Sequence, residues 1–200
     1  ALQPIRSAVG IRRINVATYQ AVSGSGKKGV EELAGQTARL LNVQPIESTV
    51  YPQQIAFNAL PAIGDLEENG YTNEEMKMVW ETQKIFEDDS ILVNPTCVRI
   101  PVFYGHGEAV HVETKSPITT DKALDLLKNA PGVCVIDQKY PIDFPTAVRD
   151  SAGKDPVFVG RVRQDISTDR GLSMWIVSDN VRKGAALNSV QIAELLKDYL

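Results

Sequence analysis

The second half of the chain places its apolar, β-branched segments one after another, with a single helical segment among them. Such residues favour strands, and strands that follow one another without helical crossovers pair antiparallel. The expected strands span 98–104, 109–114, 132–137, 156–163 and 172–178, and the helix spans 116–130. The last two strands are expected to form a hairpin. This order predicts an α+β fold with a mixed, largely antiparallel sheet and helices on one face.

The first half of the chain contains longer helical and loop segments. The expected elements are a strand within 11–22, a glycine-rich turn at 23–29, a helix at 30–41 and, at the far end of the chain, a last helix from about 181. Thr72 and Glu75 have the spacing of a capping box, which predicts a helix that runs to about Phe86. Residues 1–5 are typical of the tail of a helix that begins upstream.

Composition and charge argue against several classes of function. The chain is 43% hydrophobic with a formal net charge of -4, which is typical of one globular core and gives no support for a nucleic-acid or membrane partner. No apolar run approaches the ~20 residues that span a bilayer. His106 and His111 lack Cys or carboxylate partners at ligand spacing, so no metal site is predicted. Cys97 and Cys134 are expected to be free thiols of a cytoplasmic protein.

The segment Gly24–Gly29 matches G-x-G-x-x-G between an expected strand and an expected helix. In a dinucleotide-binding fold such glycines approach a pyrophosphate, and Glu47 stands at about the distance of the acid that binds the ribose. Glu47 does not end an apolar strand, however, and a phosphate loop is disfavoured because Lys27 is followed by Lys28 rather than Ser or Thr. A plain strand-to-helix turn is the second alternative. We favour a third, in which backbone amides at the helix N-terminus face a phosphate or a carboxamide.

Four charged or titratable side chains are candidates for a binding site, each with a structural alternative. Glu81 and Lys84 share a helical face, either as an exposed ion pair or as opposite charges presented to a zwitterionic ligand. Arg99 lies inside an apolar run and needs an anionic partner, which a structural salt bridge would also supply. His106 lies between two glycines, as an acid/base group or as a solvated loop residue. A straight strand would hold Arg99 and His106 apart, so a shared site requires the chain to bend between them.

Several segments together resemble one enzyme family. The segments are NVATYQAVSG (15–24), IAFN (55–58), ETQKI (81–85), CVRIPV (97–102), GHGE (105–108) and DNVRKGAALN (179–188). Each is short, but in this order, over essentially all 200 residues, they resemble the aspartate-semialdehyde dehydrogenases. The resemblance implies a fold like the C-terminal domain of glyceraldehyde-3-phosphate dehydrogenase-type enzymes.

The activity that the resemblance implies is the NADP-dependent reductive dephosphorylation of L-aspartyl 4-phosphate to L-aspartate 4-semialdehyde, with release of phosphate. This reaction belongs to the aspartate pathway, which supplies lysine, diaminopimelate, methionine and threonine. In the family a cysteine preceded by asparagine attacks the acyl phosphate, and the resulting thioester accepts a hydride.

The resemblance also implies site residues. His106 would be the general acid/base, and Gln20 would orient the substrate against the nucleophile. Arg99 would hold the substrate α-carboxylate as a bidentate fork. The remaining assignments are Glu81 to the substrate ammonium, Lys84 to the phosphate, and Ser23, Gly24 and Asn180 to the cofactor.

By the same resemblance, residues 1–200 would be the substrate-binding and dimerisation domain, without the NADP-binding domain and the nucleophilic cysteine. Residues 1–10 would be the tail of the nucleophile helix, and 180–200 a helix that packs on the NADP-binding domain. The isolated chain would then be inactive. Two alternatives are a catalytically inactive paralogue that acts as an interaction subunit and a small nucleotide-binding module.

A homodimer is expected, with a tetramer as the larger alternative, because one sheet face is expected to lack helices and two-fold dimers bury the same patch on both subunits. The alternative is that the NADP-binding domain covers this face. Apolar residues of the later strands are expected on this uncovered face: Val110, Val112, Val157, Val159, Met174 and Ile176. Side chains alternate between the faces of a sheet, so a slip of one residue reverses such an assignment.

Overall fold

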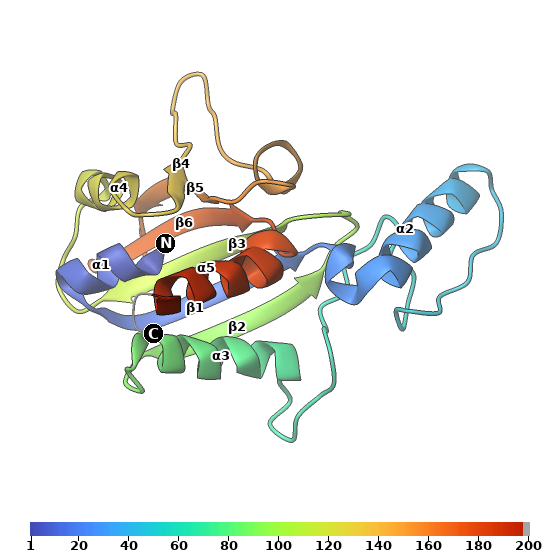
Figure 1. Cartoon of the computed structure of the whole chain (residues 1–200), viewed down its shortest axis with the longest axis horizontal. Coiled ribbons are helices and arrows are strands. Elements are labelled where there is room, and N and C mark those ends of the chain that lie inside the picture. Colours follow the sequence, from blue (N-terminus) through green and yellow to red (C-terminus); the bar gives the residue numbers. More distant parts are fainter. Residues whose placement is uncertain (198–200) are drawn as a thin grey trace.

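The computed structural model describes residues 1–197, in which one six-stranded sheet forms the centre of the molecule (Figure 1). The strands are β1 (Ile11–Gln20), β2 (Leu92–Arg99), β3 (His106–Thr114), β4 (Val133–Val135), β5 (Val157–Gln164) and β6 (Gly171–Ser178). Their order is β2-β1-β3-β6-β5-β4, with β1–β2 and β4–β5 parallel and the other pairs antiparallel. The predicted α+β fold with a mixed, largely antiparallel sheet is confirmed.

Helices precede, connect and follow these strands. They are α1 (Leu2–Val9), α2 (Gly26–Leu41), α3 (Asn73–Phe86), α4 (Thr120–Lys128) and α5 (Leu187–Leu196), with short helical turns at η1 (Val22–Ser25), η2 (Ala147–Ser151) and η3 (Arg182–Ala186). In Figure 1, α1 and α5 lie in front of the sheet, whereas α2 extends away from one end of it. None of the helices among residues 1–197 is long and apolar enough to cross a membrane.

The main core packs on the helix-covered face of the sheet, and this corrects the predicted face. Val110, Val112 and Met174 are at most 2% exposed and belong to one apolar cluster with Ile5 of α1 and Leu127 of α4. Val159 and Ile176 are buried in the same cluster, and Val157 packs against it. The predicted assignment was therefore wrong by one residue, since period-two alternation puts their neighbours on the opposite face.

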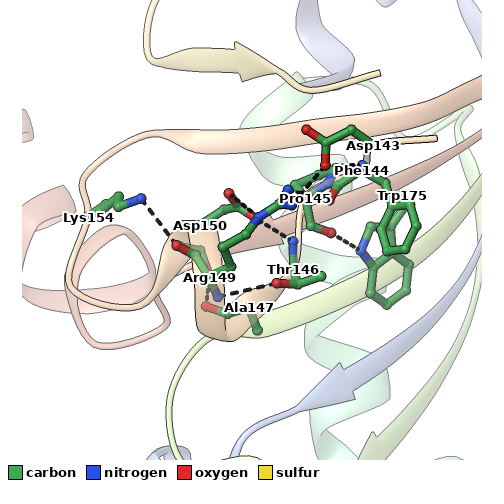
Figure 2. A network of polar contacts seen from close by, with 10 residues as sticks. Asp143, Phe144, Pro145, Thr146, Ala147, Arg149, Asp150, Lys154 and Trp175 are labelled. Carbon is green, nitrogen blue, oxygen red and sulfur yellow. Dashed lines mark hydrogen bonds and ion pairs between the residues drawn. The ribbon is translucent and has the colours of Figure 1, made fainter. Parts of the chain in front are cut away.

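The opposite, uncovered face is centred on aromatic and small side chains. Tyr19 and Trp175 lie with ring centroids 5.4 Å apart, and His111 Nδ1 lies 2.9 Å from Ser173 Oγ. The loop between β4 and β5 borders this face (Figure 2). Trp175 Nε1 donates to the carbonyl of Pro145 at 3.0 Å. This hydrogen bond ties the loop to the central strands.

The same loop is held together by one arginine. Arg149 Nη1 lies 2.8 Å from Asp143 Oδ1, and its Nε donates to Asp150 Oδ2 at 2.9 Å (Figure 2). Asp150 is buried and also accepts the backbone amide of Thr146 at 2.7 Å. These ion pairs and hydrogen bonds hold residues 143–150 together.

The strand expected at 98–104 lies earlier in the chain, at Leu92–Arg99. Pro95 is tolerated within it because β2 is the edge strand, where a missing N–H breaks no ladder. Pro101 removes another donor just after the strand, and Gly105 has φ +85°, a conformation that L side chains rarely adopt. The chain therefore turns between residues 100 and 105.

A second, smaller apolar cluster holds α2 against the chain that follows it. Its members are Val22, Leu33, Tyr51, Ile55, Ala56 and Leu60. The Glu32 carboxylate binds the loop that follows α2, because its Oε2 accepts the amides of Thr49 at 2.8 Å and Val50 at 2.6 Å. The helix begins at Gly26 rather than at the predicted residue 30.

Candidate active site

Three of the predicted site residues meet at one end of the central strands. Gln20 and Arg99 are the last residues of β1 and β2 and stand opposite each other in the parallel register. His106 is the first residue of β3, which runs antiparallel to β1. Side-chain alternation places all three on the helix-covered face. The turn at 100–105 thus supplies the bend that a shared site requires.

The ring of His106 is held by one hydrogen bond at the end of β1. Its Nδ1 accepts the backbone amide of Ala21 at 3.1 Å, and its Nε2 lies 3.4 Å from Gln20 Nε2. A neutral ring that accepts at Nδ1 carries its proton on Nε2. Burial, together with the nearby positive charge of Arg99, lowers the pKa of His106 to about 4. At neutral pH the ring is therefore uncharged, with its proton directed into the site.

Arg99 is a buried guanidinium, with 6% of its surface exposed. Its Nη1 donates to the carbonyl of Ala21 at 2.7 Å. Burial lowers its pKa, and the negative charge of Glu74 opposes this effect. A Cβ at Gly24 would lie 2.8 Å from Nη1, so a side chain at that position would collide with the guanidinium. The glycine leaves the space that Arg99 occupies.

Glu74, in the first turn of α3, completes this cluster. Its Oε1 accepts from Gln20 Nε2 at 3.1 Å, and its Oε2 lies 3.2 Å from Lys77 Nζ. Burial opposes ionisation of Glu74, but the hydrogen bonds from Gln20 and Lys77, with the positive charges of Lys77 and Arg99, keep its pKa below the usual range. The cluster thus contains an ionised carboxylate, a guanidinium and a neutral imidazole.

The structure places Glu81 and Lys84 elsewhere on α3. Glu81 stands seven residues after Glu74, which is about 10 Å along the helix axis. It lines a separate cavity of about 390 Å³, together with Met78, Thr82 and Glu108. Lys84 is exposed, one turn farther along. Within the described residues, neither side chain hydrogen-bonds to Gln20, Arg99 or His106.

The chain direction explains why the first turn of α3, rather than its end, reaches the site. The helix lies in the crossover between two parallel strands, so it runs opposite to them. Its N-terminus therefore lies near the ends of β1 and β2, where Gln20 and Arg99 stand. Glu74 and Lys77 repeat the three-residue spacing of Glu81 and Lys84, so spacing alone does not separate the two pairs. The parallel pairing of β1 with β2, together with the capping box at the start of the helix, distinguishes the two pairs.

The residues predicted for the cofactor lie beside His106. Asn180 Nδ2 donates to Ser23 Oγ at 3.0 Å, and Asn180 Oδ1 accepts the amide of Gly105 at 3.0 Å. The next glycines of the predicted motif open α2, and a Cβ at Gly29 would lie 2.7 Å from Tyr51 Oη. After α2 the chain enters a loop that contains Glu47, so the strand–helix–strand unit of a dinucleotide-binding fold does not form here.

The cysteines do not provide a reactive thiol at this site. Cys97 is fully buried, and burial raises the pKa of its thiol to about 11. A thiol with this pKa holds its proton at neutral pH and is a poor nucleophile. Cys134 is a free thiol in β4 at the other side of the sheet. Residues 1–197 contain no cluster of His, Cys, Asp or Glu that could hold a metal ion.

The chain matches known proteins over nearly its whole length. Residues 2–183 match the family described as the semialdehyde dehydrogenase dimerisation domain. An aspartate-semialdehyde dehydrogenase of Legionella pneumophila is 64% identical over 197 residues, which are 98% of this chain and 57% of the relative. Aspartate-semialdehyde dehydrogenase 2 of Vibrio cholerae is 64% identical over 200 residues, which are 100% of this chain and 58% of that protein.

A crystal structure of aspartate semialdehyde dehydrogenase II from Vibrio cholerae, complexed with ASA, superposes with a TM-score of 0.97 at 62% identity. The match covers 100% of this chain and 59% of that one. The chain therefore spans somewhat more than half the length of the relatives it matches. By sequence and by fold, it belongs to the semialdehyde dehydrogenase dimerisation-domain family.

Proposed function

We propose that this chain is the substrate-binding and dimer-forming part of an aspartate-semialdehyde dehydrogenase. The reaction is the reductive dephosphorylation of L-aspartyl 4-phosphate to L-aspartate 4-semialdehyde. One observation carries the proposal: Gln20, Glu74, Arg99 and His106 come from four separate elements and meet at one end of the sheet. A small zwitterion with a reactive carbonyl needs such a set of charges and a proton donor.

The charges of the cluster fit the two charged groups of an α-amino acid. Arg99 presents a planar fork with donors left over from its bond to Ala21, which suits the α-carboxylate. Glu74 is ionised and suits the ammonium group, a role expected from the sequence for Glu81. Lys77 beside it offers a cation for phosphate in place of Lys84. The contacts of Glu74 with Gln20 and Lys77 support this exchange.

His106 and Gln20 act at the carbonyl. The Nε2–H of a neutral His106 can hydrogen-bond to the oxygen on which charge develops and pass a proton to it. The Gln20 side chain lies between that ring and Glu74. From there it would orient the substrate against the nucleophile. The nucleophile would come from a part of the protein outside these residues, because the buried Cys97 thiol does not ionise at neutral pH.

NADPH would supply the hydride and leave as NADP⁺, and this end of the sheet offers groups to hold the cofactor. The hydroxyl of Ser23 and the amide of Asn180 are bonded to each other next to Gly105. Gly24 keeps the adjacent surface free of a side chain. A polar pair beside a bare backbone fits a carboxamide, which both donates and accepts hydrogen bonds. The C-terminal helix α5 leaves Val190, Ile192 and Leu195 more than half exposed, which fits packing against a nucleotide-binding domain.

We further propose that the homodimer forms through the uncovered sheet face. A hollow of about 470 Å³ on this face is lined mostly by apolar residues, among them Val102, Ala109 and Trp175, together with His111, Arg161 and Arg163. Val148 of the adjoining loop is 76% exposed at its rim. An apolar patch of this kind on a dimerisation-domain fold suits a two-fold partner that buries the same residues.

Kinetics of a hybrid enzyme test the roles of Arg99 and His106. In the hybrid, this chain replaces the 197 matching residues of the Legionella pneumophila relative. Arg99→Lys is expected to raise KM for the semialdehyde roughly tenfold to a hundredfold, because a point charge replaces a fork. His106→Asn is expected to lower kcat by about 10²–10⁴ with little change in KM. An inactive hybrid, or the reverse pattern, contradicts the proposal.

The His106 ring is expected to titrate near pH 4 in the folded chain. The unfolded ring titrates at about 6.5 and so binds the proton more tightly. The free energy of unfolding should therefore fall as the pH drops from about 6.5 to about 4. Arg99→Met should raise the pKa of His106, since it removes a nearby positive charge. Ring-carbon NMR shifts, assigned with His106→Gln, measure the pKa of His106 in the native chain and in Arg99→Met. A native ring that titrates near 6.5 would disprove the burial argument.

Sedimentation equilibrium tests the dimer and its face. The 21.9 kDa chain is expected to sediment at twice its mass at micromolar concentration. Val148→Asp should shift it to the monomer, because a charge would be buried in the apolar hollow. Leu41→Asp, at a 72% exposed position on α2, is the matched control and should leave the dimer intact. A dimer that survives Val148→Asp but not Leu41→Asp would place the interface on α2.

A further inference from the structure

The outer edge of β2 is closed by groups from other parts of the chain. As the edge strand, β2 has backbone groups that face away from the sheet. Arg99 exchanges two hydrogen bonds with Leu60, both of 2.9 Å. Two residues earlier, the amide of Cys97 donates to Glu75 Oε1 at 3.0 Å. Pro95, two residues earlier again, has no N–H to satisfy. A side-chain carboxylate thus takes the place of a neighbouring strand beside Arg99.

The same carboxylate also caps α3. Glu75 Oε2 accepts the amide of Thr72 at 2.8 Å, and Thr72 Oγ1 accepts the amide of Glu75 at 3.3 Å. Both residues are buried, at 8% and 2% exposure. A capping box needs only one oxygen of the acid, and its acid is usually at the surface. Here the second oxygen reaches across to β2, so one carboxylate joins the start of the helix to the strand.

Glu75 joins the two segments that carry the charged residues of the site, Glu74 on α3 and Arg99 on β2. The residue before Glu75 is Glu74, whose carboxylate contacts Gln20 and Lys77. The strand partner of Glu75 is Cys97, two residues before Arg99 on the same face of β2. The length of the link therefore sets how far the Glu74 carboxylate stands from the Arg99 guanidinium.

We propose that Glu75 is a positioning residue: it fixes the first turn of α3 to β2, and so holds Glu74 and Arg99 at the separation that fits the charged groups of the substrate. Glu75 contacts neither the substrate nor the reacting atoms. The purpose of the separation rests on the proposed function, whereas the positioning itself is a property of this fold.

The pKa of the Glu74 carboxyl reports whether this positioning holds. The groups that face Glu74 are Lys77 on its own helix, Gln20 on β1 and Arg99 on β2, with His106 on β3 beyond Gln20. Together they keep its pKa below the usual range. In Glu75→Gln, an NH₂ group replaces one of the two carboxylate oxygens. This group cannot accept a hydrogen bond from a backbone N–H, so the bond to Thr72 or the bond to Cys97 is lost. The first turn then moves, and the pKa of Glu74 rises towards the usual value.

Side-chain carboxyl NMR of the 200-residue chain measures this shift, with two matched controls. Thr72→Ala weakens the helix cap but keeps the bond from Glu75 to Cys97. Glu32→Gln breaks another carboxylate clamp on backbone amides, in the α2 lobe. All three variants are expected to lower Tm, but only Glu75→Gln should raise the pKa of Glu74. An unchanged Glu74 pKa in Glu75→Gln, or an equal rise in Thr72→Ala, would overturn the inference.

Kinetics of the hybrid enzyme separate this inference from the proposed function. In that enzyme Glu75→Gln is expected to raise KM for the semialdehyde at least tenfold, with kcat changed less than KM. Glu32→Gln should leave both unchanged. A raised pKa of Glu74 without any change in KM would support the positioning role of Glu75 and contradict the substrate role of Glu74. A loss confined to kcat would contradict the inference itself.

Discussion

The parallel pairing of β1 with β2 is the constraint on which the site depends. Two parallel neighbours end at the same edge of a sheet, so Gln20 and Arg99 stand side by side. Parallel neighbours also need a long crossover, and here it carries α2, the loop packed on it, and α3. A helix in that crossover runs opposite to the strands and brings its N-terminus to the same edge. The antiparallel return of β3 then adds His106.

Burial and neighbouring groups together set the charges of these side chains. The Arg99 guanidinium lies against the end of β1 and the bare backbone of Gly24. Burial, with the positive charge of this guanidinium, lowers the pKa of His106. Glu74 remains ionised because Gln20 and Lys77 bond to it. The cluster therefore places two opposite charges and a neutral imidazole at one end of the sheet, which suits the binding and reaction that we propose.

The order of strands and helices could be predicted from the sequence, and so could the capping box at Thr72. Hydrophobic periodicity and helix capping both depend on residues that are close in the sequence. The sheet face could not, since Val110 and Ala109 are both apolar and only tertiary packing decides which is covered. The strand before Arg99 was placed too late because Pro95 hid its beginning. Arg99 and His106 stood out from their sequence context, whereas Gln20 and the roles of all three came only from the family resemblance. The contacts of Glu74 and Lys77 with that cluster became visible only once the direction of α3 was known.

NMR mapping of substrate on the 200-residue chain tests the central claim most directly. The chain would be titrated with L-aspartate 4-semialdehyde and inorganic phosphate while backbone and side-chain resonances are followed. The account predicts saturable shifts at Gln20, Glu74, Arg99 and His106, with Glu81 and Lys84 silent. Shifts at Glu81 and Lys84, with the cluster at the strand ends unaffected, would contradict it.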